Sequence, residues 1–256
     1  MSVTTHYASV QAGDGNFSTG SSASIPNSHG GYCKVFFPCT EGSGNTLTDG
    51  IGDRVITDNV GASWIDDAKA LKPADTALGD LLSGALALPT LSATKSWAIV
   101  ALVKQHSNAI IPDKYYIQFG ANAGPQYSIT QSGAGVSMVK DGTTTYVEPA
   151  DDTGLSQVQK AGLTVMNVTY KDASDNILRT RALGDYSFNQ ANADTTAVDA
   201  VNPIEEIYVT GVSIYGLAVF EFVDGFPDDW DTGLEWMRVQ WLAGNKVLYP
   251  NWVVIQ

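Results

Sequence analysis

The residues best suited to chemistry lie near the end of the chain, in the stretch FEFVDGFPDDWDTGLEWM at 220–237. Its carboxylates are Glu221, Asp224, Asp228, Asp229, Asp231 and Glu235. Crowded carboxylates suit an acid/base pair, a set of oxygen ligands for Ca²⁺, or the negative charges at the start of a helix. The spacing of the six side chains decides among these uses.

A catalytic carboxylate pair does not fit this spacing. A retaining glycosidase holds its two carboxyl groups about 5 to 5.5 Å apart, which on a strand requires positions i and i+2. Glu221 is the acid within a predicted strand, but the position two residues later is Val223 and Asp224 points to the other face. We therefore predict no catalytic residue and a chain that is not an enzyme.

The other acids fit the first turn of a helix at about 228–243. Pro227 stands near its first position, where the missing N–H is tolerated. Three carboxylates then favour the positive end of the helix dipole, namely Asp228, Asp229 and Asp231. Helix physics alone therefore accounts for these three acids.

The same segment carries the apolar stripe of an amphipathic helix. Residues spaced by four, three and four form it: Trp230, Leu234, Met237 and Trp241. Gly244 and Lys246 supply the C-terminal stop. We expect this helix to pack its stripe onto a β-sandwich.

Metal and cofactor motifs are missing from the sequence. VDGFPDDWD departs from the D-x-[DN]-x-[DN]-G calcium pattern, so Ca²⁺ is kept only as the alternative to helix capping. The chain has no G-x-S-x-G, Walker, H-E-x-x-H or C-x-x-C motif, and its histidines are scattered at His6, His29 and His106. We expect no cofactor, no cofactor-binding residue and no metal-ligating residue.

The composition indicates one domain of strands and turns. A chain of 256 residues with 44% hydrophobic content fills one core, and only 16% of its residues are charged. A net charge of -13 repels phosphate and anionic lipid, so nucleic acid and membrane are not expected partners. The first residues lack the features of a signal peptide, which predicts synthesis in a cytoplasm and, for work outside a cell, release by a route such as host lysis.

Two cysteines, Cys33 and Cys39, are the whole cysteine content. On one strand they would lie about 20 Å apart, beyond the reach of a disulfide. We predict free thiols that pack as small hydrophobic groups, as suits a protein folded in reducing conditions.

Residues 1–31 are rich in Gly and Ser and predict a flexible N-terminal arm. Two alternatives stay open, a disordered terminus or an arm that drapes over another subunit. A second segment, 66–89, tolerates helix but is interrupted by Pro73, Gly79 and Gly84. We interpret it as a loop with a short helical turn.

Short strand signals recur after the arm, separated by turn residues. The predicted strands are 32–37, 53–58, 97–104, 114–120, 126–130, 135–140, 144–148, 163–170, 176–181, 204–209 and 214–222. Residues 97–104 are apolar on both faces, which predicts a central strand of a sheet covered on both sides. In 163–170 one face is mainly apolar and the other shows Asn167 and Thr169. The turns between strands favour antiparallel hairpins in a sandwich or barrel.

The order of four segments resembles the concanavalin A-like lectin/glucanase superfamily, and within it the LamG-type jelly rolls. They are SWAIVALVK, GLTVMNVTYKDASDNILRTRALGD, IEEIYVTGVSIYGLAVFEF and DTGLEWMRVQWLAGNK followed by LYP. The resemblance implies an all-β, antiparallel jelly-roll sandwich at 32–256 with the C-terminal helix packed on it. Glucanases of the superfamily carry an E-x-D-x-E-type strand, and Glu221 with Asp224 does not match it. No calcium ligand of the lectins carries over.

Domains of this pattern also resemble structural proteins of tailed bacteriophages. That resemblance implies a non-enzymatic virion protein, a capsid decoration or a tail-associated component, acting through contacts with other virion subunits and as a homo-oligomer. The alternative is a lectin-like, carbohydrate-binding module that touches surface polysaccharide through exposed rings such as Tyr115, Tyr127 or Tyr146. A glycan hydrolase or lyase is the third hypothesis, which the missing carboxylate pair disfavours.

Overall fold

The computed structural model describes most of the β-sheet scaffold and all of the C-terminal helix. The described residues are 32–52, 54–58, 63–67, 69–72, 82–83, 94–105, 115–119, 127–131, 137–141, 144–147, 164–174, 178–184, 188–190, 207–209 and 212–252. The predicted arm at 1–31 lies outside them. Among the described residues, no helix is long and apolar enough to cross a membrane.

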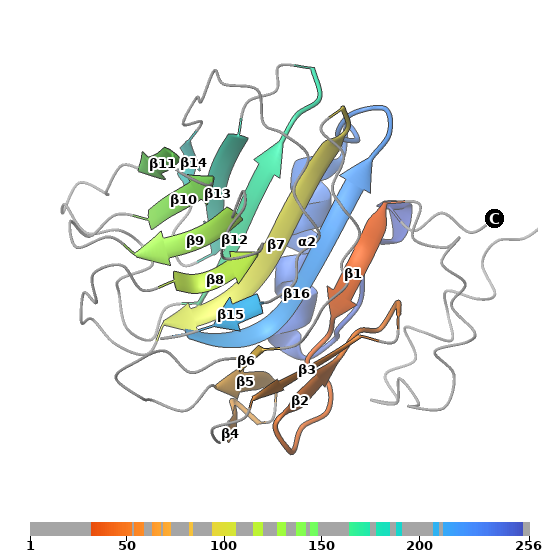
Figure 1. Ribbon diagram of the computed structural model, residues 1–256. Coiled ribbons are helices and arrows are strands. Elements are labelled where there is room, and N and C mark those ends of the chain that lie inside the picture. The colour runs from red at the N-terminus through yellow and green to blue at the C-terminus, as the bar shows by residue number, and fades with distance from the viewer. Residues whose placement is uncertain are drawn as a thin grey trace, which may run out of the picture.

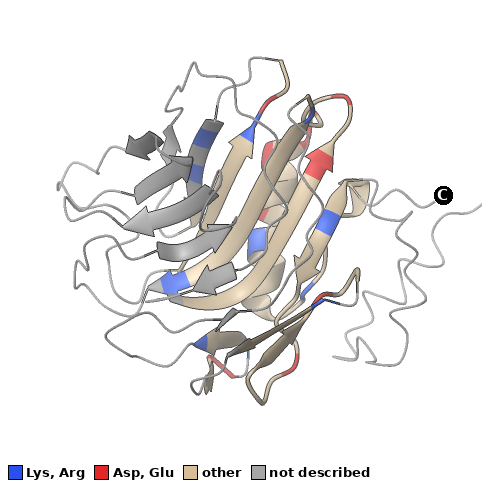
Figure 2. Ribbon diagram, viewed as in Figure 1, with Lys and Arg blue, Asp and Glu red and all other residues tan. Residues whose placement is uncertain are grey.

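The scaffold is a large antiparallel sheet (Figure 1). In the order of pairing its strands are β14 (Phe188–Gln190), β13 (Leu178–Gly184), β12 (Thr164–Lys171), β7 (Ser96–Gln105), β16 (Val212–Phe222), β5 (Ala70–Lys72) and β4 (Ser63–Ile65), with β1 (Cys33–Phe37) paired to the same side of β16 as β5. The charged residues of β7, β12 and β16 lie at or near the strand ends (Figure 2). The middle of these three strands therefore carries no charged side chain.

Two smaller antiparallel sheets account for the other strands of the described residues. One has the order β11 (Thr144–Val147), β10 (Ser137–Asp141), β9 (Tyr127–Gln131), β8 (Tyr115–Phe119) and β15 (Ile207–Val209), and the other has β2 (Thr46–Thr48), β3 (Val55–Asp58) and β6 (Leu82–Ser83). The helix α2 (Trp230–Ala243) lies behind the large sheet in the view of Figure 1. The predicted all-β antiparallel jelly-roll sandwich with a C-terminal helix is confirmed.

The central strand of the large sheet is β7, as the sequence predicts. It pairs with β12 on one side and β16 on the other, and its residues from Trp97 to Val103 are buried. Alternate residues of β7 meet the helix, so that Ala98, Val100 and Leu102 belong to the core between α2 and the sheet. Both faces of this strand are covered.

Each of the eleven predicted strand segments overlaps an observed strand, but the prediction misses β2, β4 and β14, and two further details of it are wrong. Segment 66–89 is not only a loop, because β5 and β6 lie within it; β5 pairs with β4 and β16. The polar face of β12 does not meet water, because Asn167 and Thr169 are as buried as their apolar neighbours. The pairing of strands explains β5 and β6, and the cover over the sheet explains the burial of Asn167 and Thr169. The local sequence pattern predicts neither the pairing nor the cover.

Helix α2 begins two residues later than predicted and ends where the sequence places its stop. The N–H of Trp230 donates to the carbonyl of Pro227 at 2.9 Å, so Pro227 belongs to the turn before the helix. Asp229 is the N-cap, and Gly244 closes the other end in the left-handed conformation with φ 95°. The predicted stripe of Trp230, Leu234, Met237 and Trp241 is buried against the large sheet.

Cys33 and Cys39 are free and buried, as predicted. The premise that one strand carries both is wrong, because β1 ends at Phe37. Burial raises the pKa of both thiols, that of Cys39 to about 12. Both side chains therefore stay protonated at neutral pH and pack as apolar groups.

Candidate functional site

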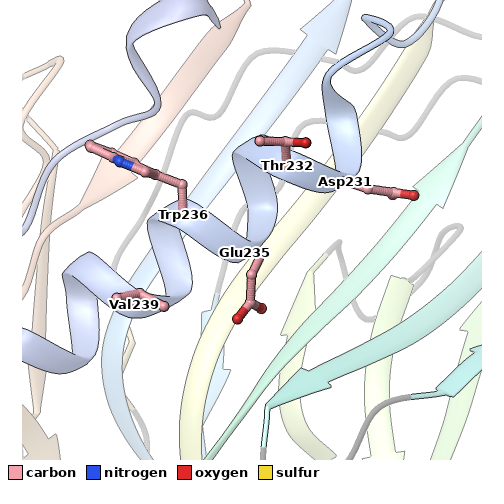
Figure 3. A pocket seen from close by; sticks show the side chains of 5 residues that line it. All are labelled: Asp231, Thr232, Glu235, Trp236 and Val239. Atoms are coloured by element: carbon pink, nitrogen blue, oxygen red, sulfur yellow. The ribbon is translucent and has the colours of Figure 1, made fainter.

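An open depression lies on the solvent side of helix α2 (Figure 3). Its volume is about 550 Å³, and its lining residues are Asp231, Thr232, Glu235, Trp236 and Val239. These positions follow one another at helical spacing, beside the buried stripe, so they share the outward side of the helix. One face of the helix thus packs against the sheet, and the opposite face forms the depression.

The apolar part of the depression is formed by Trp236 and Val239. Trp236 is partly buried, and its ring meets the ring of Tyr249 edge-on at a centroid distance of 5.7 Å. Val239 is 47% exposed. The contact with Tyr249 holds the indole ring in one orientation, so the ring can serve as a prearranged apolar platform.

The polar part of the depression consists of two ion pairs. Asp231 accepts a hydrogen bond from Nη1 of Arg181, which reaches it from β13. Glu235 accepts from Arg238 through two bonds, Nε to Oε2 at 2.8 Å and Nη2 to Oε1 at 2.5 Å. The hydrogen bond from Arg238 lowers the pKa of Glu235, so this carboxylate stays ionised in mild acid.

The carboxylate is the exposed partner in both ion pairs. The Asp231 side chain is 72% exposed and that of Arg181 only 8%. The Glu235 side chain is 50% exposed and that of Arg238 18%. The depression therefore presents carboxylate oxygens outward, each oriented by a guanidinium group behind it.

A second polar group lies next to the first turn of α2, where the chain returns after the helix. One oxygen of Asp229 accepts from the indole Nε1 of Trp252 at 3.0 Å, and the other accepts from the amide of Asn251 at 2.7 Å. The same Asn251 amide donates to the hydroxyl of Tyr249 at 3.3 Å. Burial pulls the pKa of Asp229 upward, but the hydrogen bonds from Asn251, Trp252 and Tyr249 outweigh it and lower the pKa.

The predicted role of the acids at the helix start is only partly right. Asp229 is the N-cap, yet its side chain makes no capping hydrogen bond and holds Asn251 and Trp252 instead. Asp231 is in the first turn, where its charge suits the dipole, but it also pairs with Arg181. Tertiary partners, not the dipole alone, fix these carboxylates.

Glu221 lies on a strand, apart from the acids of the helix, and has different partners. It is buried near the end of β16 and pairs with Nζ of Lys95 at 3.0 Å. Three residues are register partners across neighbouring strands: Glu221 of β16 pairs with Trp97 of β7, and Trp97 pairs with Lys171 of β12. Asp224 is exposed in the following turn. Glu221 therefore belongs to a buried charged row of the large sheet.

Sequence reasoning missed Arg181, Trp236 and Asn251 as parts of the site. Trp236 stands next to the helical stripe and could have been found as the large ring that the stripe leaves out. Arg181 and Asn251 carry no such signal, because they come from β13 and from the turn Pro250–Trp252. Only the packing of these segments against α2 brings them to it.

Several other predicted residues cannot be placed in a site. Tyr115, Tyr127 and Tyr146 lie on β8, β9 and β11, whose backbone alone is described. His6, His29 and His106 lie outside the described residues. Within the part of the chain that the structure describes, no three His, Cys, Asp or Glu residues are grouped to hold a metal ion.

Comparison with known proteins finds similarity in solved structures. No protein-family model matches the chain, and no curated protein does. Similar structures include a Ruminococcus gnavus IT-sialidase CBM40 (14% identity, 54% of this chain and 80% of that one, TM-score 0.37). Another is domain 4 of AbnA, a GH43 extracellular arabinanase from Geobacillus stearothermophilus, in complex with arabinotriose (14%, 79% and 97%, TM-score 0.44). A third is a Bauhinia forficata lectin in complex with GalNAc (9%, 66% and 93%, TM-score 0.36).

Proposed function

We propose that this chain is a non-catalytic, lectin-like module that binds carbohydrate in the depression on helix α2. The observation that carries the proposal is the oriented, partly exposed ring of Trp236, which lines one depression together with Asp231 and Glu235. Sugar rings have apolar faces and hydroxyl edges. An aromatic platform beside hydrogen-bond acceptors is the arrangement that fits both.

The apolar and the polar side chains of the depression have different roles in binding. The ring of Trp236 and the side chain of Val239 cover one face of a sugar, and burial of apolar area supplies most of the affinity. Asp231 and Glu235 accept hydrogen bonds from hydroxyl groups and fix the orientation of the sugar. Because the depression is open, the ligand extends beyond it, as a chain of sugars does.

Removal of the aromatic platform tests the proposal. We expect Trp236→Ala to weaken glycan binding about five- to thirtyfold, because a stacked ring contributes on the order of 1 to 2 kcal/mol. Binding is screened on a glycan array that includes α2,3-sialyllactose, arabinotriose and GalNAc and is quantified by calorimetry. Trp64→Ala is the matched control, since Trp64 is a partly exposed tryptophan on β4, outside the depression.

A second variant protects the test against loss of folding. Thr232 is exposed in the depression, so Thr232→Tyr fills the space without touching the core. Circular dichroism checks that each variant stays folded. Glycan binding that survives both Trp236→Ala and Thr232→Tyr contradicts the proposed site.

We propose as a second candidate a non-enzymatic structural subunit of a bacteriophage virion, made in the host cytoplasm. Three large apolar side chains are exposed among the described residues, namely Val55 at 45%, Val223 at 60% and Val239 at 47%. Val239 also lines the depression on α2, which offers a surface for another subunit. None of the three similar structures named above is a virion protein. The two candidates are compatible if a particle uses the module to touch surface polysaccharide.

A further inference from the structure

We infer that Asp224 is a site of spontaneous modification, at which the main chain rearranges to isoaspartate through the amide nitrogen of Gly225. An aspartate followed by glycine suits this reaction, because glycine has no Cβ to hinder the approach of its nitrogen to the carboxyl group. The two residues lie in the turn that follows β16, just past the arrowhead of that strand in Figure 1. The inference does not depend on the proposed binding of carbohydrate.

The reaction needs no partner other than water. The nitrogen of Gly225 forms a bond to Cγ of Asp224, and the hydroxyl group of the carboxylic acid leaves as water with the amide hydrogen. The product is a succinimide ring. Water then opens the ring at either carbonyl carbon. Attack at Cγ restores aspartate, whereas attack at the main-chain carbonyl leaves the chain joined through Cβ and Cγ, which is isoaspartate.

The surroundings of Asp224 leave both reacting groups accessible. Its side chain is exposed, and the described residues provide no hydrogen bond to its carboxylate or from the N–H of Gly225. Gly225 has φ 93°, and a Cβ at this position would have no neighbouring atom within 4 Å. The turn therefore has room for the nitrogen and the carboxyl group to meet.

The same dipeptide occurs at Asp49 and Gly50, where the structure opposes the reaction. The side chain of Asp49 is fully buried, and its Oδ1 accepts from the N–H groups of Phe36 and Ile51, both at 3.0 Å. Its Oδ2 pairs with Nη1 of Arg54 at 2.6 Å. The N–H of Gly50 donates to the carbonyl of Phe36 at 2.7 Å. Both reacting groups of this pair are thus held apart by other partners.

The modification changes the link between β16 and α2. Isoaspartate adds a carbon atom to the main chain, within the segment 223–225 that joins Phe222 to Phe226. The rings of Phe222 and Phe226 lie 5.3 Å apart, and Phe226 lies 4.6 Å from Trp230 of α2. A longer link alters this packing, so the modified chain should unfold at a lower temperature. The start of α2 is therefore sensitive to the age of the protein.

Storage of the full-length protein in warm, neutral buffer for several weeks tests the inference. Isoaspartate is detected by methylation with an isoaspartyl methyltransferase and is located by mass spectrometry of peptides. We expect it to accumulate at least about tenfold faster at Asp224 than at Asp49, because the hydrogen bonds around Asp49 must break before it reacts. In the chain unfolded in guanidinium chloride the two positions should react at similar rates.

Two variants separate the reaction at this position from other changes during storage. Asp224→Glu keeps the charge but must close a larger ring, so it should form no isoaspartate here and should keep its unfolding temperature. Asp224→Asn should react faster than the wild type, since an amide loses ammonia more readily than a carboxylate loses water. The unfolding temperature of the stored wild type should fall as isoaspartate accumulates.

The outcomes distinguish the site from its effect. Equal rates at Asp224 and Asp49 in the folded protein, or isoaspartate at Asp224 only after unfolding, would show that the structure does not select this site and would overturn the inference. If isoaspartate accumulates at Asp224 while the unfolding temperature stays equal to that of Asp224→Glu, the site stands and the effect on α2 is overturned.

Discussion

Lys246 shows how a single residue takes a role that its sequence position does not reveal. The stop signal after α2 includes this lysine, but the structure buries it to 4% exposure. Its ammonium group donates to the carbonyls of Lys69 at 2.9 Å and Tyr215 at 2.5 Å and lies 5.2 Å from the centroid of the Tyr215 ring. The segment after the helix is thereby tied to β16 and to the start of β5.

The burial of Lys246 predicts a pH-dependent contribution to stability. Loss of hydration lowers its pKa to about 8, below the unfolded value of about 10.4. Between these values the unfolded chain binds more protons, so the contribution of Lys246 to the free energy of unfolding rises with pH. The rise should be on the order of 2 to 3 kcal/mol across this window.

The measurement compares urea unfolding of the wild type and Lys246→Met from about pH 7.5 to 10.5. The wild type should gain stability relative to the variant as the pH increases. Cys33, Cys39 and Tyr215 have raised pKa values and lower the stability of both proteins at high pH. Cys39 does so more strongly in the variant, because the charge of Lys246 lowers the pKa of Cys39 in the wild type, and this adds to the expected difference. Parallel stability curves for the two proteins would contradict the role given to the Lys246 ammonium group.

At the scale of elements, aromatic packing around Trp230 holds the first turns of α2. Trp230 stacks on Trp252 at a centroid distance of 4.8 Å, and Trp252 meets Phe220 and Phe222 of β16 edge-on at 5.4 and 5.9 Å. The chain after the helix thus folds back and covers its first turns. Because the helix positions Trp236, this packing also positions the candidate site.

Gly233 lets the chain come this close to the helix. A Cβ at this position would lie 2.3 Å from Cζ2 of Trp252 and 2.7 Å from Cδ1 of Tyr249. We expect Gly233→Ala to destabilise the protein by about 1 to 3 kcal/mol, although alanine is the better helix former. Thr232→Ala, on the exposed side of the same turn, should be neutral or slightly stabilising. Thermal unfolding measures both, and a Gly233→Ala variant as stable as Thr232→Ala would refute the close packing.

At the scale of the whole molecule, the large sheet is the support for the helix and for the candidate site. One face supports α2 and hence the candidate site, while β1, β5 and β4 extend the sheet beyond β16. The net charge of -13 keeps such a molecule soluble and acts against unspecific association. A stable assembly would need buried apolar surface against this repulsion, and Val239 on α2 is an exposed apolar side chain that could supply part of it.

The proposed structural role predicts a defined oligomer. Light scattering after size-exclusion chromatography should give a discrete trimer or larger assembly for the full chain, and a smaller species for a chain that begins at Tyr32, if residues 1–31 drape over a neighbour. Val239→Asp should also weaken an assembly built on α2, while Val55→Asp, at an equally exposed valine on β3, should not. A monomer at every concentration, with or without residues 1–31, would exclude this role and leave glycan binding.

The sequence by itself determined the strand-rich class, the central place of residues 97–104, the apolar stripe of the C-terminal helix and its end at Gly244. These features depend on local periodicity and on turn and cap residues, which act through neighbours in the chain. The exclusion of Glu221 and Asp224 as a pair also needed only the alternation of side chains along a strand.

Only the tertiary structure decided the candidate site. The pairing of Arg181 with Asp231 joins β13 to α2 across 50 positions of the chain, and the contact of Asn251 with Asp229 needs the turn that follows the helix. The burial of Asn167, Thr169 and Lys246 likewise depends on what covers them. Contacts between segments that are distant in the chain produce no repeating pattern in the sequence. The reason is that the packing of whole strands and helices, and not the neighbouring residues in the chain, determines which side chains meet.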